Sequence, residues 1–433
     1  MGDIIAILKD VPFSVAAFLI AVSIVVFVHE AGHYIAARLS GISVLVFSIG
    51  FGRPLLRARD RHGTIWQIAA IPIGGFVRFA EPNEQENAGK QRYTALTDAP
   101  LRHRIFTVFA GPLANFLLAA AIFSLFAAAD GIVGEDATID SVRPMPGSPF
   151  GFARGDRIIA VDGQQVDSLP DFYRIAVREE FSGNAEYAVQ RDGSVVRIVG
   201  PHPFPPIVTS VRPSSPAATA GLKRGDVIQA VNGRPIHSFP ELGRLIQSSG
   251  GVEILLSYWR DGEDRQLRLA GQSEDIPLPG GGFERRVLIG VSGGSFFTPE
   301  TLPVGPISAL QSGIQQTATI ISGTVNGIVS MIKGQISGCN IQGPIGIAEI
   351  SADAAAQGSK SFIQLIAFLS VAIGFINLLP IPALDGGHLG FYLYEALSGR
   401  PPSPDFTRYA TLAGIVVIVM LMGFGLLNDL TCP

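Results

Sequence analysis

Four long apolar stretches run along the chain. The first begins near residue 11 within the segment 1–40, and the others lie near 104–129, 361–385 and 409–428. A helix needs about 20 mainly apolar residues to cross the hydrocarbon core of a bilayer, so each stretch predicts one transmembrane helix. The expected fold is therefore a multi-pass α-helical membrane protein with four transmembrane helices.

A fifth stretch, Pro306–Ile332, also repeats apolar residues at helical spacing, but Ser, Gln, Thr and Asn fill its opposite face. That pattern is typical of an amphipathic helix that lies on a surface. A fifth crossing would also put the end of the next span on the side of the membrane away from the end of the first. We therefore predict a linker with an amphipathic surface helix over 293–360.

The segment 41–103, between the first two spans, has a different pattern. Residues 43–48 alternate in the manner of a strand, and glycines recur at 50, 52, 63, 74 and 75, which predicts β-hairpins. Strands near a membrane must be buried in protein or line a wet cavity. Two interpretations remain open: a membrane-associated hairpin that offers its edge to an extended substrate, or an ordinary cytoplasmic hairpin.

Positive charge is concentrated between the first two spans. The ten cations there are Arg38, Arg53, Arg57, Arg59, Arg61, Arg78, Lys90, Arg92, Arg102 and Arg104. Short loops rich in Lys and Arg remain in the cytoplasm, so we expect 41–103 and the later loop 386–408 on the cytoplasmic side. Both termini and residues 130–360 are then expected on the opposite side.

Two copies of one pattern follow the second span. The run Arg-Gly-Asp-Arg-Ile-Ile-Ala-Val-Asp-Gly at 154–163 recurs as Arg-Gly-Asp-Val-Ile-Gln-Ala-Val-Asn-Gly at 224–233. A repeat of this length, with strand and turn residues in alternation, predicts two copies of one small domain. We expect two inserted β-rich domains, one over 130–203 and one over 204–292.

The second copy resembles the PDZ domain family over its run from 221 to 233. The loop residues of that motif are Gly221, Leu222, Gly225 and Asp226. The resemblance implies two PDZ domains, each with a groove between a strand and a helix that accepts a peptide end or strand. The first copy departs from the motif at 146–152, so its groove is expected to differ or not to bind. A steric fence over the active site is the alternative role for both copies.

Composition supports a membrane protein. Hydrophobic residues make up 47% of the chain and charged residues 16%, against about 25% charged in typical domains. The net charge of −4 is small and evenly spread, which argues against a nucleic-acid partner. Cys339 and Cys432 lack the spacing of metal ligands; they could form one disulfide outside the cytoplasm or remain two unrelated thiols.

Polar groups occur inside the first apolar stretch, at His29, Glu30 and His33. Residues four apart share one face of a helix, so both histidines can bind one Zn²⁺ while Glu30 reaches the open coordination position as general base. A chance match is the alternative. Unpaired polar groups in hydrocarbon are costly, and metal binding is one of the few arrangements that offsets that cost. The pattern therefore predicts hydrolysis.

A catalytic zinc commonly takes three protein ligands and keeps one position for water, so a third ligand is needed. The topology brings the end of the third span to the same leaflet as His29. Asp385 stands there, after two prolines and before two glycines, and is the third ligand we predict. An interfacial carboxylate in a turn is the alternative. His388 is a competitor that should face the aqueous side.

Three separated motifs together resemble the site-2 protease family of intramembrane zinc metalloproteases. They are His-Glu-Ala-Gly-His at 29–33, Gly-Pro-Leu-Ala-Asn-Phe at 111–116 and Asn-Leu-Leu-Pro-Ile-Pro-Ala-Leu-Asp-Gly at 377–386. The resemblance covers essentially the whole chain. It implies one Zn²⁺ per chain, with His29, His33 and Asp385 as ligands and Glu30 as the base.

The same resemblance implies residues that handle the substrate. A membrane-associated β-loop that pairs with substrate would contain Gly74, Gly75, Phe76 and Val77. Asn115 and Asn377 would lie near the metal, where they could bind the substrate backbone or stabilise a developing oxyanion. Hydrogen bonds between packed helices are the alternative role of both asparagines.

The family implies regulated intramembrane proteolysis in a bacterial inner membrane. Its substrates would be single-pass membrane proteins, such as the anti-sigma factor of a sigma-E stress response, after another protease has trimmed their outer domain. Remnant signal peptides are a second class. A metal-dependent scaffold or sensor that acts through its PDZ domains is the alternative, and Glu30 discriminates because a structural zinc needs no base. A metal transporter is disfavoured, since four spans with one charged cluster give no ion path.

Overall fold

The computed structural model describes residues 2–81, 94–177, 183–212, 215–277, 283–334 and 343–431. Cys339 and Cys432 lie outside these ranges, so their pairing stays a prediction. The chain forms two compact units. The first, the helical unit, contains residues 1–127, 306–330 and 338–433, and the second, the β unit, contains 128–305 and 331–337.

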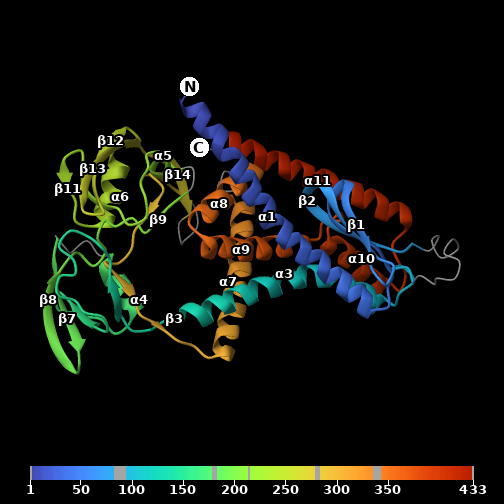
Figure 1. The fold of residues 1–433 in the computed structure, drawn as a ribbon, viewed down its shortest axis with the longest axis horizontal. Coiled ribbons are helices and arrows are strands. Elements are labelled where there is room, and N and C mark those ends of the chain that lie inside the picture. Colours follow the sequence, from blue (N-terminus) through green and yellow to red (C-terminus); the bar gives the residue numbers. More distant parts are fainter. Residues whose placement is uncertain are drawn as a thin grey trace. The chain divides into compact units, whose positions relative to one another are not determined.

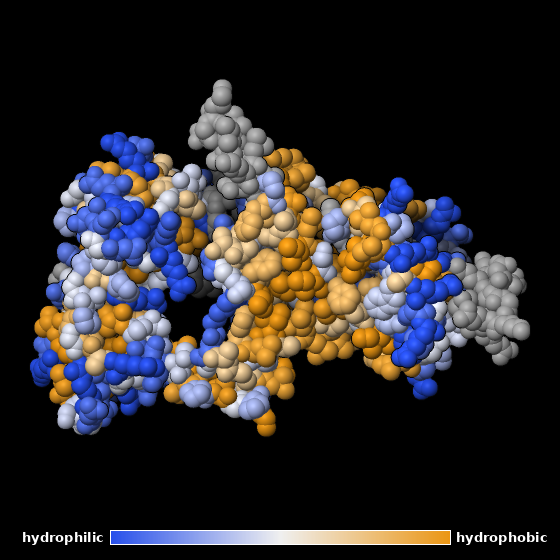
Figure 2. Space-filling model, viewed as in Figure 1, coloured by the Kyte–Doolittle hydropathy of each residue, from blue (hydrophilic) through white to orange (hydrophobic). Residues whose placement is uncertain are grey.

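The described part of the helical unit contains seven helices and one β-hairpin (Figure 1). The helices are α1 (Gly2–Leu39), α3 (Leu101–Asp130), α7 (Pro306–Ile332), α8 (Pro344–Ala356), α9 (Ser359–Leu378), α10 (Asp385–Ser398) and α11 (Pro404–Thr431). Four helices among the described residues are long and apolar enough to cross a membrane: α1 from Pro12, α3, α9 and α11. Figure 2 shows hydrophobic residues spread over the visible surface of these helices.

Small residues let the helices of this unit approach closely. A Cβ atom at Gly32 of α1 would lie 2.3 Å from the carbonyl oxygen of Ala110 in α3. Ala21, Ala119 and Ala367, from three different helices, are completely buried in one apolar cluster. Such contacts are typical of helices that pack within a membrane, where close backbone approach replaces the hydrophobic effect.

The third predicted span ends earlier than expected. Helix α9 stops at Leu378, because Pro380 and Pro382 have no N–H to continue the helix. The chain then turns and starts a new helix, α10, at Asp385. Most of the segment 386–408, which the sequence predicts as a loop, is therefore helical.

The predicted linker over 293–360 also contains more structure than one helix. Helix α7 has the bounds expected of the amphipathic helix, and it buries small residues, Ala309, Gly313 and Thr317, while large apolar residues face outward. Helix α8 follows, and its first N–H groups are capped by the Asp429 carboxylate, 2.7 Å from Gly343 N and 2.9 Å from Ile345 N. The capping side chain is remote in sequence, because the N-cap residue, Gly343, has no side chain that could accept these hydrogen bonds.

Strands β1 (Val44–Arg59) and β2 (Ile65–Phe79) form an antiparallel hairpin that folds back on itself. Phe47 in the middle of the sheet is paired with both Val77 and Trp66, one residue from each half of β2. The segment 75–79 is therefore one outer edge of this sheet, and the segment 54–59 is the other.

The β unit contains the two repeated patterns as two similar folds. The first copy has β4 (Ile139–Val142), β5 (Arg157–Val161), β6 (Gln164–Gln165), α4 (Leu169–Ala176), β7 (Ala185–Arg191) and β8 (Ser194–Gly200). The second has β9 (Ser210–Val211), α5 (Pro216–Thr219), β10 (Val227–Val231), β11 (Arg234–Pro235), α6 (Phe239–Ser248), β12 (Glu253–Arg260), β13 (Glu263–Ala270), β14 (Gln272–Pro277), β15 (Phe283–Leu288) and β16 (Val291–Ser292). Each copy is centred on an apolar cluster of its own, and the cluster of the first copy also includes Val227 from β10 of the second.

The two copies are nested and not simply consecutive. In the second copy β9 pairs with β16, but the equivalent strand of the first copy, β4, pairs with β17 (Phe297–Pro299), which follows the whole second copy. Outside this pair, β3 (Ile132–Val133) pairs with β18 (Thr301–Leu302). The first copy therefore extends beyond its expected limits of 130–203, and the second is inserted within it.

Candidate metal centre

The two histidines of the HExxH sequence lie on one face of α1 and point at the same carboxylate. His29 Nε2 and His33 Nε2 are 3.2 Å apart, and Asp385 Oδ2 lies 3.1 Å from the first and 3.3 Å from the second. Both histidines are buried. Among the residues that the structure describes, these three form the one group of His, Cys, Asp and Glu side chains arranged to hold a metal ion.

The backbone of α3 fixes the orientation of His33. Its Nδ1 lies 2.9 Å from the carbonyl oxygen of Thr107, which can only accept, so the ring proton is on Nδ1. The Nε2 lone pair then points toward His29 and Asp385. This is the usual arrangement of a metal-binding imidazole, whose second nitrogen donates to a carbonyl or carboxylate.

Asn115 of α3 plays the equivalent part for His29. Its fully buried amide nitrogen, Nδ2, lies 3.3 Å from His29 Nδ1, and its Oδ1 has no hydrogen-bonding partner among the described residues. The two ends of an amide exchange by rotation. The orientation with Oδ1 facing the ring satisfies that oxygen and leaves the His29 Nε2 free to bind a metal.

Two glycines allow Asp385 to reach this position at the start of α10. A Cβ atom at Gly386 would lie 2.3 Å from the carbonyl oxygen of Leu379, and one at Gly387 would lie 2.3 Å from Pro382 Cα. Only glycine therefore lets the helix start so close to the turn before it. Further along, α10 is joined to α3 by a bidentate ion pair between Glu395 and Arg104, at 2.6 and 2.9 Å.

The chemistry of these three side chains fits a zinc ion. Asp385 Oδ2 is buried and accepts no hydrogen bond from the described residues, although two imidazole nitrogens surround it. Two nitrogens and one oxygen are the ligand set of many catalytic zinc sites, which keep a fourth position for water. His29, His33 and Asp385 would hold the ion.

The predicted base, Glu30, lies between this cluster and the sheet edge 75–79. A Cβ atom at Gly75 would be 3.3 Å from Glu30 Cγ, and the backbone of Val77 lies near the Glu30 carboxylate. The helix therefore presents Glu30 to the edge of β2, which brings the HExxH sequence and the predicted β-loop together.

Other predicted residues have different surroundings. Gly74 has φ +100° and Phe76 stacks on Phe51 with ring centroids 5.9 Å apart, so both shape the hairpin. Asn377 is half-buried in the last turn of α9, and no described residue bonds its amide. His388 is exposed, three residues beyond Asp385 and outside the metal-binding group.

Gly111 is a residue of the site whose role the sequence alone does not show. A Cβ atom there would lie only 2.3 Å from His33 Nε2, the atom that faces the metal position. Its place in the Gly-Pro-Leu-Ala-Asn-Phe motif was the available signal. Glycine at this point keeps α3 from pushing the imidazole out of place.

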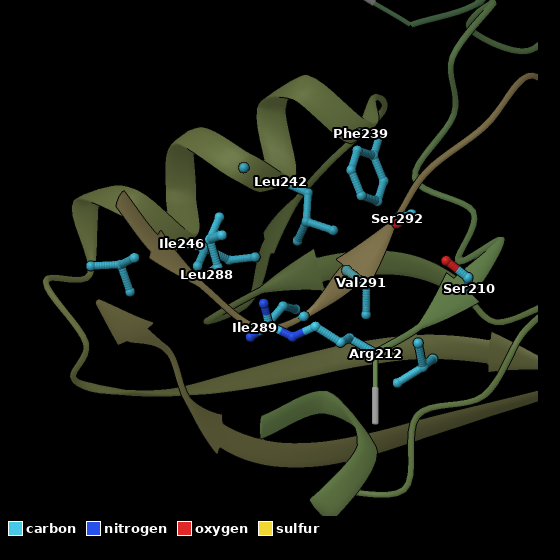
Figure 3. A pocket seen from close by; sticks show the side chains of 13 residues that line it. Ser210, Arg212, Phe239, Leu242, Ile246, Leu288, Ile289, Val291 and Ser292 are labelled. Carbon is cyan, nitrogen blue, oxygen red and sulfur yellow. The ribbon is translucent and has the colours of Figure 1, made fainter. Parts of the chain in front are cut away.

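The second copy of the β unit has a groove between α6 and the chain around β16 (Figure 3). Its volume is about 500 Å³, and its apolar wall includes Phe239, Leu242, Ile246 and Val291. The first copy differs: the position equivalent to Val291 is Phe297, which is fully buried with its ring 5.2 Å from that of Phe172. Its own aromatic side chain fills that position.

The predicted PDZ loop residues have structural roles in the second copy. Gly221 and Gly225 take φ of +84° and +98°, Leu222 is in the core, and Asp226 is buried and bonded to Arg260 at 2.6 and 2.7 Å. None of the four lines the groove. They shape the domain, and the groove is made by other residues.

The chain matches the family model described as Peptidase family M50 over residues 17–421. The chain belongs to peptidase family M50. This confirms the resemblance to the site-2 proteases.

The similarity between this M50 peptidase and its relatives extends over nearly its whole length. A Brucella suis protein provisionally named a zinc metalloprotease is 33% identical over 428 residues, covering 96% of this chain and 95% of the relative. A Salmonella typhi protein named regulator of sigma E protease is 30% identical over 454 residues, covering 96% and 98%.

A solved PDZ domain of an SdrC-like protein from Listeria monocytogenes is also similar to part of the chain. It is 24% identical, with a TM-score of 0.18, and covers 20% of this chain and 84% of the solved one. At that score, the likeness does not identify a fold for either copy.

Replacing Asn115 with Leu is expected to weaken zinc binding about 10–100-fold, the usual effect of losing an outer partner of a metal-binding histidine. Asn115 is the described side chain bonded to His29 Nδ1. Competition with a chelator would measure the affinity. Thr107→Val is the matched control, because its hydroxyl bonds no described residue and its carbonyl, which holds His33, remains. Equal losses in both variants would contradict the assignment.

Proposed function

We propose that this M50 peptidase is a zinc-dependent intramembrane protease. The observation that carries the proposal is the convergence of His29, His33 and Asp385, with Glu30 beside them, inside a helical unit whose helices are apolar enough to span a membrane. The names of the relatives, a zinc metalloprotease and a regulator of sigma E protease, support the same chemistry.

Zinc at this position would lower the pKa of a bound water and polarise the scissile carbonyl. The protein's own part in the reaction is proton transfer. Glu30 takes a proton from the attacking water and returns it to the leaving amine. Asn115 and the Thr107 carbonyl keep the two imidazoles oriented for metal binding.

The substrate must be extended to react, because a helix engages its carbonyls in hydrogen bonds to the N–H groups four residues on. We place the extended segment along the outer edge 75–79 of the β1–β2 sheet. Gly75 and Val77 of that edge lie beside Glu30, and strand addition to an exposed edge is a common way to bind extended chains.

The membrane placement follows from charge. The cations between the first two apolar helices put the β1–β2 sheet and the metal-binding residues toward the cytoplasm. The β unit, which joins α3 to α7 in the chain, would then face the periplasm of a bacterial inner membrane, as would both termini. Single-pass proteins of the anti-sigma type, trimmed on that face by another protease, are the proposed substrates, and remnant signal peptides are a second class.

The test is incubation of the purified full chain in lipid with a panel of tagged single-pass proteins, with and without a metal chelator. The expected result is cleavage of trimmed substrates that the chelator stops and added zinc restores. Zinc-bound protein that cleaves no member of the panel would argue against the proposal.

The β unit is proposed to select trimmed substrates. Removing residues 135–299 and joining Gly134 to Glu300 through an Asn-Gly turn keeps the β3–β18 pair, where Gly134 N lies 3.1 Å from Glu300 O. If the unit is a steric gate, the shortened protein should cleave untrimmed substrates as fast as trimmed ones. Gel analysis of both substrates would show this. If cleavage by the shortened protein still depends on trimming, the β unit is not a steric gate.

A second variant distinguishes a gate from a peptide-binding groove. Gly243 lines the groove, and a Cβ atom there meets nothing within 4 Å. Gly243→Tyr gives the second copy the residue that the first has at the equivalent position, Tyr173, and would block the groove. If the groove binds the new end of a trimmed substrate, this variant should cleave it more slowly than Gly243→Ala does.

A further inference from the structure

Asp60, at the turn between β1 and β2, accepts four hydrogen bonds. Its Oδ1 accepts from the backbone N–H groups of His62, at 2.8 Å, and Thr64, at 3.0 Å. Its Oδ2 accepts from the Tyr34 hydroxyl at 3.1 Å and from Trp66 Nε1 at 3.0 Å. One oxygen therefore closes the turn, while the other bonds two aromatic side chains.

These two aromatic residues connect the sheet to α1. Tyr34 follows His33 directly and is four residues beyond Glu30, so it belongs to the helix that carries the metal-binding residues. Trp66 belongs to β2. Through Oδ2, Asp60 therefore bonds both sides of the contact between the helix and the sheet. Burial raises the pKa of Asp60, but the four hydrogen bonds outweigh burial and hold that pKa below its usual range.

A stack of rings carries this contact to the sheet edge beside Glu30. The Trp66 ring stacks on Phe47 with centroids 4.3 Å apart, and Tyr34 lies edge-on to both, at 5.1 Å from Trp66 and 6.0 Å from Phe47. Phe47 is fully buried and pairs directly with Val77. Asp60 is therefore connected to the edge 75–79 through direct contacts, from Trp66 to Phe47 to Val77.

We propose that Asp60 is a positioning residue that anchors the β1–β2 sheet to α1 and so holds the edge 75–79 beside Glu30. The charge of Asp60 is not needed for the turn alone, which uses one oxygen. The second oxygen serves only the helix–sheet contact. The kinetic part of this inference rests on the proposed function, because it assumes that an extended substrate binds at this edge.

Asp60→Asn separates the two halves of the interaction. The amide oxygen can keep the His62 and Thr64 bonds, but the amide nitrogen then faces the Trp66 N–H, and two donors cannot bond. The expected result is a rise of about tenfold in KM for a tagged single-pass substrate, the effect of losing one hydrogen bond to a charged group, with kcat within about twofold and zinc content unchanged.

The matched control is Asp98→Asn, an exposed aspartate of the same segment between α1 and α3. If Asp60→Asn has the same KM as this control, the inference is wrong. If zinc content and kcat fall while KM rises, Asp60 supports the metal site and not the edge. That result would also overturn the inference. Tyr34→Phe removes one donor to Asp60 and keeps the phenyl ring, so a smaller increase in KM is expected. Trp66→Phe removes the other donor together with part of the ring stack on Phe47, so its KM should increase at least as much. An unchanged KM in both variants would contradict the anchor.

Tryptophan fluorescence tests the anchor without any measurement of proteolytic activity. The chain has two tryptophans, Trp66 and Trp259, so Trp259→Phe leaves Trp66 as the sole reporter. In that background Asp60→Asn should make Trp66 more accessible to acrylamide, and Asp98→Asn should not; equal quenching in both would overturn the anchor. A wild-type protein that cleaves nothing would instead count against the proposed function and leave this result standing.

Discussion

Replacing Glu30 with Gln is expected to abolish peptide cleavage while zinc stays bound. The amide has nearly the shape of the carboxylate, but it cannot take a proton from water. General base catalysis typically contributes about 10²–10⁴-fold to the rate, so the loss in kcat should be of this size or larger. Cleavage of a tagged single-pass substrate and the zinc content would be measured on the same purified samples.

The same variant separates a protease from a scaffold or a zinc sensor. A structural zinc site has no use for a base beside its ligands, so a scaffold would keep its function with Gln at this position. Retained cleavage by Glu30→Gln would remove Glu30 from the mechanism. Loss of zinc together with cleavage would instead place Glu30 among the groups that hold the metal, contrary to the structure, where His29, His33 and Asp385 form that group.

Replacing Asp385 with Ala is expected to remove both the bound zinc and the activity. Two imidazoles four residues apart would remain, and two ligands are too few for a catalytic zinc. The loss in zinc affinity should exceed the roughly 10–100-fold that an outer partner contributes. Metal analysis after dialysis against a weak chelator would measure it.

The chain offers a matched control for that variant. Asp405 also lies in the first turn of a helix, α11, but it is exposed and outside the metal-binding group. Asp405→Ala should therefore retain zinc and cleavage. If Asp385→Ala keeps its zinc, the third ligand must be another residue, and the exposed His388 would be the first to examine.

The sequence could predict that the candidate metal ligands lie together because their arrangement depends on local geometry. Residues four apart on a helix share a face whatever surrounds them, so the structure brings His29 and His33 together as expected. Asp385 was placed by counting membrane crossings, which needs only hydropathy and charge. The structure likewise places Gly75 and Val77 beside Glu30, although the pattern of strand residues alone left an ordinary hairpin equally open.

The remaining features depend on contacts between distant segments. The Thr107 carbonyl that holds His33 is a backbone atom, and its position has no residue-type signal. The boundary between α9 and α10 is an exception, because the two prolines before Asp385 and the two glycines after it are local and visible in the sequence. The nesting of the two copies is set by β17 pairing with β4, across more than a hundred residues of sequence, and the repeat itself does not show that partner.

The central claim is that the residues His29, Glu30, His33 and Asp385 hydrolyse a peptide bond within a membrane-spanning segment. The most direct test is mass spectrometry of the products formed from a tagged single-pass substrate by the full chain in lipid. The account predicts one pair of new ends inside the apolar segment of the substrate, which is absent with Glu30→Gln. New ends only in the polar regions on either side of that segment, or the same ends with Glu30→Gln, would contradict it.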